Sequence, residues 1–338
     1  MSTTRCLAEI RALGPDAVVI GAGIVGLSAA QALQASGRRV AIVTADEVGA
    51  TTSNLAAAVW YPTKVGPPDR ALEWGRRSYE ALREASTDRA SGVLMRNTVA
   101  VHREPPGRPW WTAAVPGVRD ARPDELPPGY RFGLAFTVPL AEMPVHLRWL
   151  AERFRAAGGT LHRGRLRTLA ELAGVAPLVV NCAGLGARDL VPDAAVTPIR
   201  GQVVRTTRVG LQVSVRDEHH PGGYTYIHPR TDDCILGGTV DVGDEDTTPD
   251  EAVTAAILER CTALAPALRD AEVLEVMVGL RPGRPSVRLE RDPSAVPDAM
   301  VVHDYGHGGA GVTLAWGCAE EVVRLADAPA PAPPRRCG

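Results

Sequence analysis

The fold expected for this chain is decided by the stretch Val-Ile-Gly-Ala-Gly-Ile-Val-Gly-Leu-Ser, residues 19–28. The apolar run at 17–20 stops at the first of these glycines, which is typical of a buried parallel strand. Small and apolar residues then follow at helical spacing as far as Gly37, a residue suited to end a helix. A second apolar run at 40–43 has the composition of another buried strand. The sequence therefore predicts a β-α-β unit.

The three glycines of this unit have the spacing G-x-G-x-x-G between a strand and a helix, the context that a dinucleotide-binding turn requires. Gly21 permits the tight turn, Gly23 lets a pyrophosphate approach the backbone, and Gly26 permits close packing of helix on strand. The helix N-terminus favours the anion. Asp46, after the second strand, is a candidate acceptor for a ribose hydroxyl. A glycine-rich turn without a ligand is the alternative, and the motif alone does not separate a flavin from a nicotinamide.

Length and charge exclude several classes of protein. The 338 residues suggest about two domains at roughly 150 residues each. Lys and Arg number 37 against 39 acids, so no basic excess exists to bind a phosphate backbone, and no nucleic-acid partner is expected. Apolar runs are broken well short of the ~18 residues that a membrane span needs. The first 15 residues lack the apolar region of a secretory signal. We therefore expect a cytoplasmic protein with no membrane partner.

The reactive residue types also exclude familiar chemistries. The six cysteines form no C-x-x-C pair, which argues against a disulfide framework or a zinc site. Lys64 is the single lysine, so pyridoxal-phosphate chemistry would rest on that residue alone and is not expected. His303 and His307 do not have the spacing of convergent metal ligands, and His307 is interpreted as a structural histidine rather than a catalytic one. No metal ligand is assigned.

Strands and helices of the dinucleotide-binding type recur in the middle and at the end of the chain, so the domains are expected to be discontinuous in sequence. The Pro- and Arg-rich stretch 62–140 interrupts them and predicts loops, short helices and inserted strands. The other predicted elements are a helix at 147–154, a strand at 178–180, mixed strands with one helix (251–264) between 195 and 280, and a strand at 300–302 followed by a helix through Leu325.

Three further segments carry candidate chemistry. Small and hydroxylic residues at 50–58 would let a planar cofactor lie against the backbone, although an N-capped, Ala-rich helix start is an equal alternative. At 278–285, Arg281 is held by Gly and Pro on a stiff backbone that suits a bidentate carboxylate clamp; a surface arginine in a loop is the alternative. At 303–313 a strand enters glycines and then a helix, a second place where backbone can touch a cofactor.

Together these segments resemble the D-amino-acid oxidases, FAD enzymes of the wider glutathione-reductase-like flavoprotein group, from about residue 16 to 325. The stretch at 19–28 is common to many flavoproteins. Two stretches are more specific: Gly-Leu-Arg-Pro-Gly-Arg-Pro-Ser-Val-Arg-Leu-Glu at 279–290, and His-Asp-Tyr-Gly-His-Gly-Gly-Ala-Gly-Val-Thr at 303–313, followed by Trp316 and Gly317. Their order and spacing are those of the family.

The resemblance implies an α/β fold in which a Rossmann-type FAD-binding domain is interleaved with an α+β substrate-binding domain. The second domain is expected to be built on a mixed or antiparallel sheet. A homodimer is common among such proteins and is a candidate assembly here. The implied boundaries are 16–60, 141–195 and 280–326 for the FAD-binding domain, 61–140 and 196–279 for the substrate-binding domain, and 327–338 for a disordered Pro-rich tail.

The same resemblance implies roles for individual residues. Arg281 would hold the α-carboxylate of the substrate, and Tyr226 would donate its hydroxyl to the same carboxylate. The backbone carbonyl of Gly309 would accept a hydrogen bond from the substrate amine, and His228 would line the pocket. The residues implied for FAD binding are Gly21, Ala22, Gly23, Ile24, Val25, Gly26, Asp46, Thr51, Thr52, Ser53, Ala57, Ala58, Leu166, Gly308, Gly309, Gly311, Val312 and Thr313.

The implied reaction moves a hydride from the α-carbon of a D-amino acid to flavin N5, which requires alignment rather than a protein acid or base. No catalytic acid or base is therefore assigned. The imino acid would hydrolyse to a 2-oxo acid and ammonia, and O2 would reoxidise the flavin with release of H2O2.

The sequence also departs from the family pattern. Gly222 stands where mammalian members carry a lid tyrosine, and Tyr224 would share a strand face with Tyr226 and cover the site in part. Arg216 resembles one of the basic residues that D-aspartate oxidases use, but Val240 stands where another would be. Neutral D-amino acids are therefore favoured as substrates. D-aspartate oxidase, an oxidase of glycine or sarcosine, and a non-enzymatic nucleotide-binding protein are the alternatives.

Overall fold

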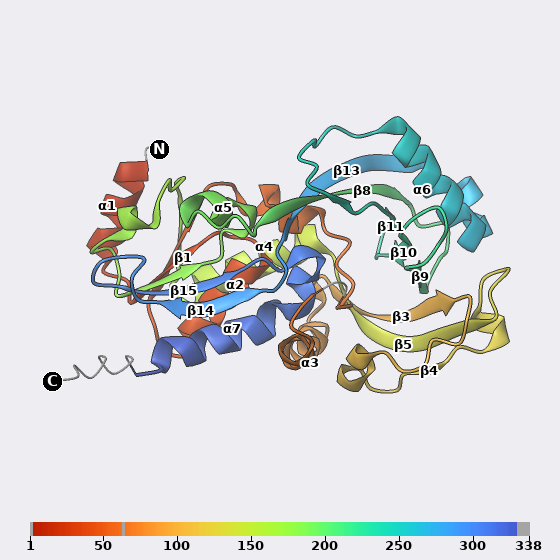
Figure 1. Ribbon diagram of the computed structural model, residues 1–338, viewed down its shortest axis with the longest axis horizontal. Coiled ribbons are helices and arrows are strands. Elements are labelled where there is room, and N and C mark those ends of the chain that lie inside the picture. Colours follow the sequence, from red (N-terminus) through yellow and green to blue (C-terminus); the bar gives the residue numbers. More distant parts are fainter. Residues whose placement is uncertain (1–2, 63–64, 330–338) are drawn as a thin grey trace.

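A computed structural model describes residues 3–62 and 65–329. Lys64 and the proline-rich residues from 330 onward lie outside the described residues. Two β-sheets lie side by side along the long axis of the molecule, each with its own covering helices (Figure 1). Within the described residues, no helix has the length and apolar character needed to cross a lipid bilayer.

The first sheet has six strands, all parallel except for the antiparallel pair at its edge. Three of its strands, at Ala17–Ile20, Val40–Thr44 and Leu178–Asn181, are buried along their whole length, as their continuous apolar sequence predicts. The strands are, in spatial order, β14 (Arg288–Asp292), β15 (Met300–Tyr305), β7 (Leu178–Asn181), β1 (Ala17–Ile20), β2 (Val40–Thr44) and β6 (Thr160–Arg163).

Helices cover both faces of this sheet. One face, represented by Val19, packs against α2 (Ile24–Ala35), α4 (Met143–Ala156) and α7 (Gly311–Asp327). The other, represented by Val18, packs against α1 (Thr3–Leu13) and α5 (Ala187–Leu190). Alternate residues of β1 thus enter two cores, as expected of a strand in the middle of a doubly covered sheet. The predicted β-α-β unit is confirmed by β1, α2 and β2.

The second sheet has nine strands and is mixed, because β3 and β9 are parallel while its other pairs are antiparallel. Helix α6 (Glu251–Leu264) packs on one face of it. The strands are β3 (Val93–His102), β4 (Arg119–Asp120), β5 (Phe132–Ala141), β8 (Thr197–Thr207), β9 (Ser214–Asp217), β10 (Thr225–Pro229), β11 (Asp233–Gly237), β12 (Asp241–Val242) and β13 (Val273–Gly283).

The stretch 62–140 is more regular than its composition predicts. The strands β3 and β5, ten residues each, confirm the inserted strands that were predicted. The 18-residue helix α3 (Pro68–Ala85) was not expected, because only short helices were predicted here. Residues such as Ala71, Trp74 and Tyr79 recur at helical spacing and are buried on one face of α3. Two arginines of this helix, Arg76 and Arg77, form ion pairs with Glu73 one turn away on its exposed face.

Each sheet is built from strands that lie far apart in the sequence, and the fold is mixed α/β as expected. The division into domains at the expected boundaries stays a prediction. Strand β13 runs through the boundary drawn at 279/280 and remains paired with β8 as far as Gly283. At the far end, α7 includes Asp327, the first residue assigned to the tail.

Candidate functional site

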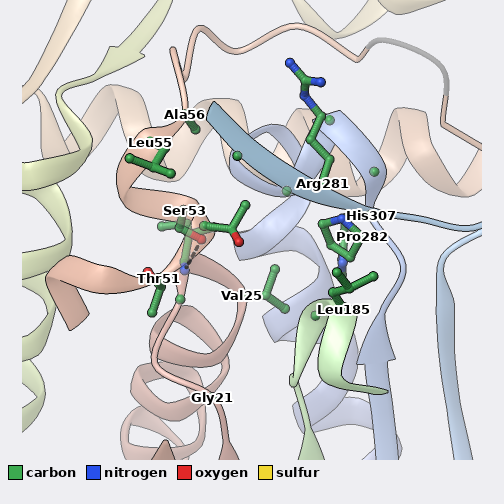
Figure 2. Close-up of a pocket in the computed structure, with 18 of the residues that line it drawn as sticks. Gly21, Val25, Thr51, Ser53, Leu55, Ala56, Leu185, Arg281, Pro282 and His307 are labelled. Carbon is green, nitrogen blue, oxygen red and sulfur yellow. Dashed lines mark hydrogen bonds between the residues drawn. The ribbon is translucent and has the colours of Figure 1, made fainter. Parts of the chain in front are cut away.

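A cavity of about 720 Å³ lies where the carboxyl ends of β1, β7 and β15 meet one face of the nine-stranded sheet (Figure 2). The glycine-rich turn after β1 forms one end of it, and residues of β8, β10 and β13 line the other. The carboxyl edge of a parallel sheet is where ligands bind in folds of this kind. Residues of both sheets line the cavity, so two molecules bound at its two ends would lie in contact with each other.

The glycines of the turn after β1 are required by close backbone approach. Gly21 has a φ of +98°, and a Cβ there would lie 2.6 Å from the carbonyl oxygen of Cys182 on the neighbouring strand. A Cβ on Gly26 would lie 2.0 Å from the carbonyl oxygen of Gly21, so α2 packs directly on the turn. Gly23 is the N-cap residue of α2 and lines the cavity. The turn therefore offers exposed backbone and a helix N-terminus to an anion.

The segment at 50–58 lies against the same helix end. Ile24 donates its backbone N–H to Ser53 Oγ over 3.1 Å, the contact dashed in Figure 2. Only one short turn of 3-10 helix (Thr52–Leu55) forms here, and Ala58 has a φ of +54°. The alternative of an Ala-rich helix start was wrong. The extended backbone instead exposes Ala56, Ala57 and Ala58 along the cavity wall.

Asp46 and Leu166 lie on the cavity wall near the ends of β2 and β6. Asp46 is exposed and forms an ion pair with Arg165 over 3.5 Å. Arg165 and Arg167 also line the cavity, and sequence analysis did not identify them. Their only sequence signal is basic charge just after a strand that itself was not predicted.

At the opposite end of the cavity, Arg281 extends from β13 across the neighbouring strand. Its Nη1 donates to the carbonyl oxygens of Arg200 (3.3 Å) and Thr239 (3.1 Å). A Cβ on Gly201 would lie 2.2 Å from that same nitrogen, so only glycine leaves room for the guanidinium. Nε and Nη2 form no hydrogen bond with the described part of the chain. The alternative of a surface arginine in a loop was wrong, because Arg281 lies in a strand and lines the cavity.

Three aromatic residues of one strand face lie beside Arg281. Tyr224, Tyr226 and His228 occupy alternate positions and all line the cavity. The Tyr226 ring stacks on His228 (centroids 4.7 Å apart) and meets Tyr224 edge-on at 5.3 Å. The shared face expected for the two tyrosines is therefore confirmed. The Tyr226 ring lies over Gly237, where a Cβ would be 2.0 Å from Cζ.

Burial sets the protonation of this aromatic row. It raises the pKa of Tyr226 to about 12, so the hydroxyl stays protonated and able to donate. Burial, with the charge of Arg216, lowers the pKa of His228 well below 6.5, so its imidazole is neutral at pH 7. His228 Nδ1 is buried and has no hydrogen-bond partner among the described residues.

The segment 303–313 closes the cavity between its two ends. Strand β15 leads into a short 3-10 turn (Gly308–Ala310) and then α7. A Cβ on Gly309 would lie 3.6 Å from Arg281 Cδ, so this turn lies against the Arg281 side chain. Gly308, Gly309, Gly311, Val312 and Thr313 all line the cavity.

His307 is buried beside Asp304, with 3.3 Å between Nε2 and Oδ1. One ligand atom from each of Asp304, His307 and Cys318 lies within 4.8 Å of the others, so these residue types could hold a metal ion. The spacing of the histidines gave no sign of this, because Cys318 joins the group from the second turn of α7. The assignment of no metal ligand and the structural role of His307 stay predictions.

Of the residues predicted to bind FAD or substrate, all but Gly26 line the one cavity. Gly26 packs against the carbonyl oxygen of Gly21, which is the packing role that its place in the motif predicts. Residues from six separate stretches of sequence (21–25, 46–58, 166, 226–228, 281 and 308–313) are thus brought together. A charged cluster of Tyr61, Arg216 and Glu218 lies at the end of the cavity lined by Arg281 and Tyr226. Sequence analysis did not identify Tyr61 and Glu218.

Comparison with known proteins gives this geometry its context. The family model described as FAD dependent oxidoreductase matches residues 16–325. The chain belongs to this family. A D-amino-acid oxidase of Rubrobacter xylanophilus is 50% identical to the oxidoreductase over 315 residues, which cover 92% of this chain and 96% of the relative. A human D-aspartate oxidase is 37% identical over 325 residues, covering 91% and 93%.

Among solved structures, a glycine oxidase from Geobacillus kaustophilus superposes on the oxidoreductase with a TM-score of 0.78, covering 92% of this chain and 94% of that one. Because its sequence is only 19% identical, this similarity shows a shared fold alone. The cofactor of the oxidoreductase is FAD, as its family description states. The cavity fits FAD. A Cβ on Gly21 would lie 2.6 Å from Cys182 O and one on Gly23 would lie 2.9 Å from Ser53 Oγ, so both positions are glycine and no side chain covers the backbone there.

Proposed function

We propose that the protein oxidises D-amino acids with neutral side chains to 2-oxo acids and ammonia, reducing O2 to H2O2. The observation that carries this proposal is Arg281: a guanidinium anchored through Nη1 alone, with two nitrogens uncommitted, in the same cavity as the dinucleotide-type turn. An α-carboxylate is the planar anion that such a fork binds in two places. The identities with D-amino-acid and D-aspartate oxidases support the substrate class.

Each residue at this end of the cavity has a positioning task. Arg281 would fix the carboxylate, and the protonated Tyr226 hydroxyl, which has no hydrogen bond to the described residues, would donate to the same group. The carbonyl of Gly309 would accept from the substrate amine. With carboxylate and amine both held, only one enantiomer can direct its α-hydrogen toward the cofactor. FAD, when bound, supplies the hydride acceptor and passes the electron pair to O2.

The residues proposed to hold FAD are those of the turn after β1, the 51–58 segment, Asp46, Leu166 and the 308–313 segment. The N-terminus of α2 would face the pyrophosphate, and the exposed alanines would lie against the flavin. No step of the proposed reaction needs a protein acid or base, because the chemical step is the hydride transfer itself.

The test is a panel of substrates on the purified holoenzyme. D-Alanine, D-valine and D-proline should generate peroxide and bleach the flavin anaerobically, while the L-enantiomers should not. Arg281→Ala should raise KM and lower kcat/KM, because the substrate carboxylate loses its buried partner. The activation free energy that corresponds to kcat/KM should rise by about 3–5 kcal/mol. Arg205→Ala, at an arginine of β8 that pairs with Glu275 instead of lining the cavity, is the matched control and should stay near wild type. A change at Arg281 of less than tenfold would reject the clamp.

The alternatives make different predictions in the same panel. An oxidase of glycine or sarcosine would turn those over faster than D-valine. A nucleotide-binding protein without activity would keep its flavin oxidised under every substrate. We also propose a homodimer in the cytoplasm, which light scattering of the purified protein and fractionation of cells would check.

A further inference from the structure

A charged cluster lies at the substrate end of the cavity, away from the dinucleotide-type turn. The side chain of Arg216 is 3% exposed and lines the cavity. Its Nη2 forms an ion pair with Glu218 Oε1 at 3.1 Å and donates to the Tyr224 hydroxyl. The guanidinium lies over the ring of Tyr61, 3.3 Å from its centroid, and the Tyr61 hydroxyl donates to Glu218 Oε2 over 3.2 Å.

Cross-strand register places this cluster opposite Arg281. Arg216 on β9 is the register partner of Tyr226 on β10, and Tyr226 is the partner of Gly237 on β11. Directly paired residues in antiparallel strands share a face, so this row runs from Arg216 across Tyr226 toward the strand over which Arg281 lies. Burial raises the pKa of Tyr226, and the charges of Arg281 and Arg216 both oppose that rise. Tyr226 therefore lies within electrostatic reach of both guanidinium groups.

A substrate whose α-carboxylate is held by Arg281 would extend its side chain over Tyr226 toward this cluster. The guanidinium of a buried arginine strongly attracts a second carboxylate of the substrate, because a desolvated cation requires a counter-ion. Glu218 already supplies that counter-ion. Glu218 does not itself line the cavity, but its carboxylate is bonded to Arg216 Nη2. An acidic side chain that reached Arg216 would share this one cation with Glu218, and two anions close together repel each other.

We propose that Glu218 is a specificity-determining residue, which excludes acidic side chains from the site by neutralising Arg216. This inference rests on the proposed function, since it concerns which D-amino acids that site accepts. It assigns to Glu218 a role in selectivity rather than in the chemistry, so its effect falls on the relative rates of substrates. Removing its charge without changing its shape should convert the cluster into a second carboxylate site.

The experiment compares wild-type holoenzyme with Glu218→Gln, in which the amide retains an oxygen for the Tyr61 hydroxyl. We expect the ratio of kcat/KM for D-glutamate or D-aspartate to that for D-alanine to rise about tenfold or more, mainly through KM. The double variant Glu218→Gln/Arg216→Met should lose this gain. Glu275→Gln, which removes the partner of Arg205 in the same sheet, is the matched control and should leave the ratio unchanged.

A binding measurement separates this inference from the proposed function. Flavin absorbance titrations with succinate and with butyrate require no turnover, and Glu218→Gln should tighten succinate selectively. If wild type fails to oxidise D-alanine, the proposed function is wrong, while the succinate result still tests Glu218. An unchanged ratio and unchanged succinate binding in Glu218→Gln would overturn the inference. Should that variant not fold, Arg216→Met leaves Glu218 without this cation and should shift selectivity toward D-lysine; no shift would overturn the inference as well.

Discussion

The two ends of the cavity are built in different ways. The turn after β1 is a compact structure: Gly21, Gly23 and Gly26 lie within six residues, and Gly26 packs on Gly21 itself, although Cys182 and Ser53 approach Gly21 and Gly23 from other parts of the chain. The opposite end, proposed to bind substrate, is assembled from β8, β9, β10, β11 and β13, which sheet pairing brings into register. The comparison teaches that the dinucleotide cradle is a property of one motif, whereas the substrate end is a property of cross-strand register.

The largest effect is expected at the local end. In Gly26→Ala the new methyl would lie 2.0 Å from the carbonyl oxygen of Gly21, and neither backbone can move without displacing α2 from β1. We expect a destabilisation of about 3 kcal/mol and a colourless protein, measured by denaturant unfolding and flavin content. Gly49→Ala is the control, because a Cβ there meets nothing within 4 Å. A yellow, stable Gly26→Ala protein would show that the turn does not depend on this packing.

The second prediction concerns the sheet-built end. In Gly201→Ala the methyl would occupy the place of Arg281 Nη1, 2.2 Å away, and would displace the guanidinium. We expect kcat/KM for D-alanine to fall about a hundredfold, equivalent to about 2.7 kcal/mol, while FAD content stays at the wild-type level. The two measurements together test whether the ends are independent. If FAD content fell with activity, the contrast drawn between them would not hold.

A smaller effect is expected where the two ends are joined. The hydroxyl of Thr313 on α7 accepts from the backbone N–H of Tyr61 and donates to its carbonyl oxygen, both over 3.1 Å and both buried. Thr313→Val would leave two buried backbone groups without partners, at a cost of about 2 kcal/mol in the free energy of unfolding. Thermal unfolding would measure it. Thr313→Ser keeps both hydrogen bonds and should cost less than half as much.

The smallest effect is a pH dependence at the sheet-built end. Burial and the charge of Arg216 lower the pKa of His228 in the folded protein, so below about pH 6.5 the unfolded chain binds a proton that the folded chain does not. Stability should therefore fall on acidification, by up to about 1.4 kcal/mol per pH unit from this residue. Denaturant unfolding between pH 7 and 5 would show a shallower slope in His228→Gln. An equal slope in both proteins would mean that His228 is protonated in the folded state.

Sequence reasoning succeeded where the signal was local. Continuous apolar runs predicted β1, β2 and β7, and glycine spacing predicted the turn, because the pattern that indicates each of them lies within a few consecutive residues. It failed over α3, where a composition rich in Arg concealed a buried helical stripe whose partner, α7, lies more than 200 residues further along the chain. It also missed Glu218, because a partly exposed carboxylate in the turn after β9 has no local pattern that separates it from any surface acid.

The sequence by itself thus determined the β-α-β unit, since it follows from glycine positions and periodicity within one short stretch, and the resemblance of the stretches at 19–28, 279–290 and 303–313 indicated the family and its FAD cofactor. Only the tertiary structure decided which groups meet at the substrate end. Strand pairing placed Arg281 over Gly201, and Tyr226 between Arg281 and Arg216 with its partner Glu218. The physical reason is that sheet register brings together residues far apart in the chain, and their charges interact through space rather than along the sequence.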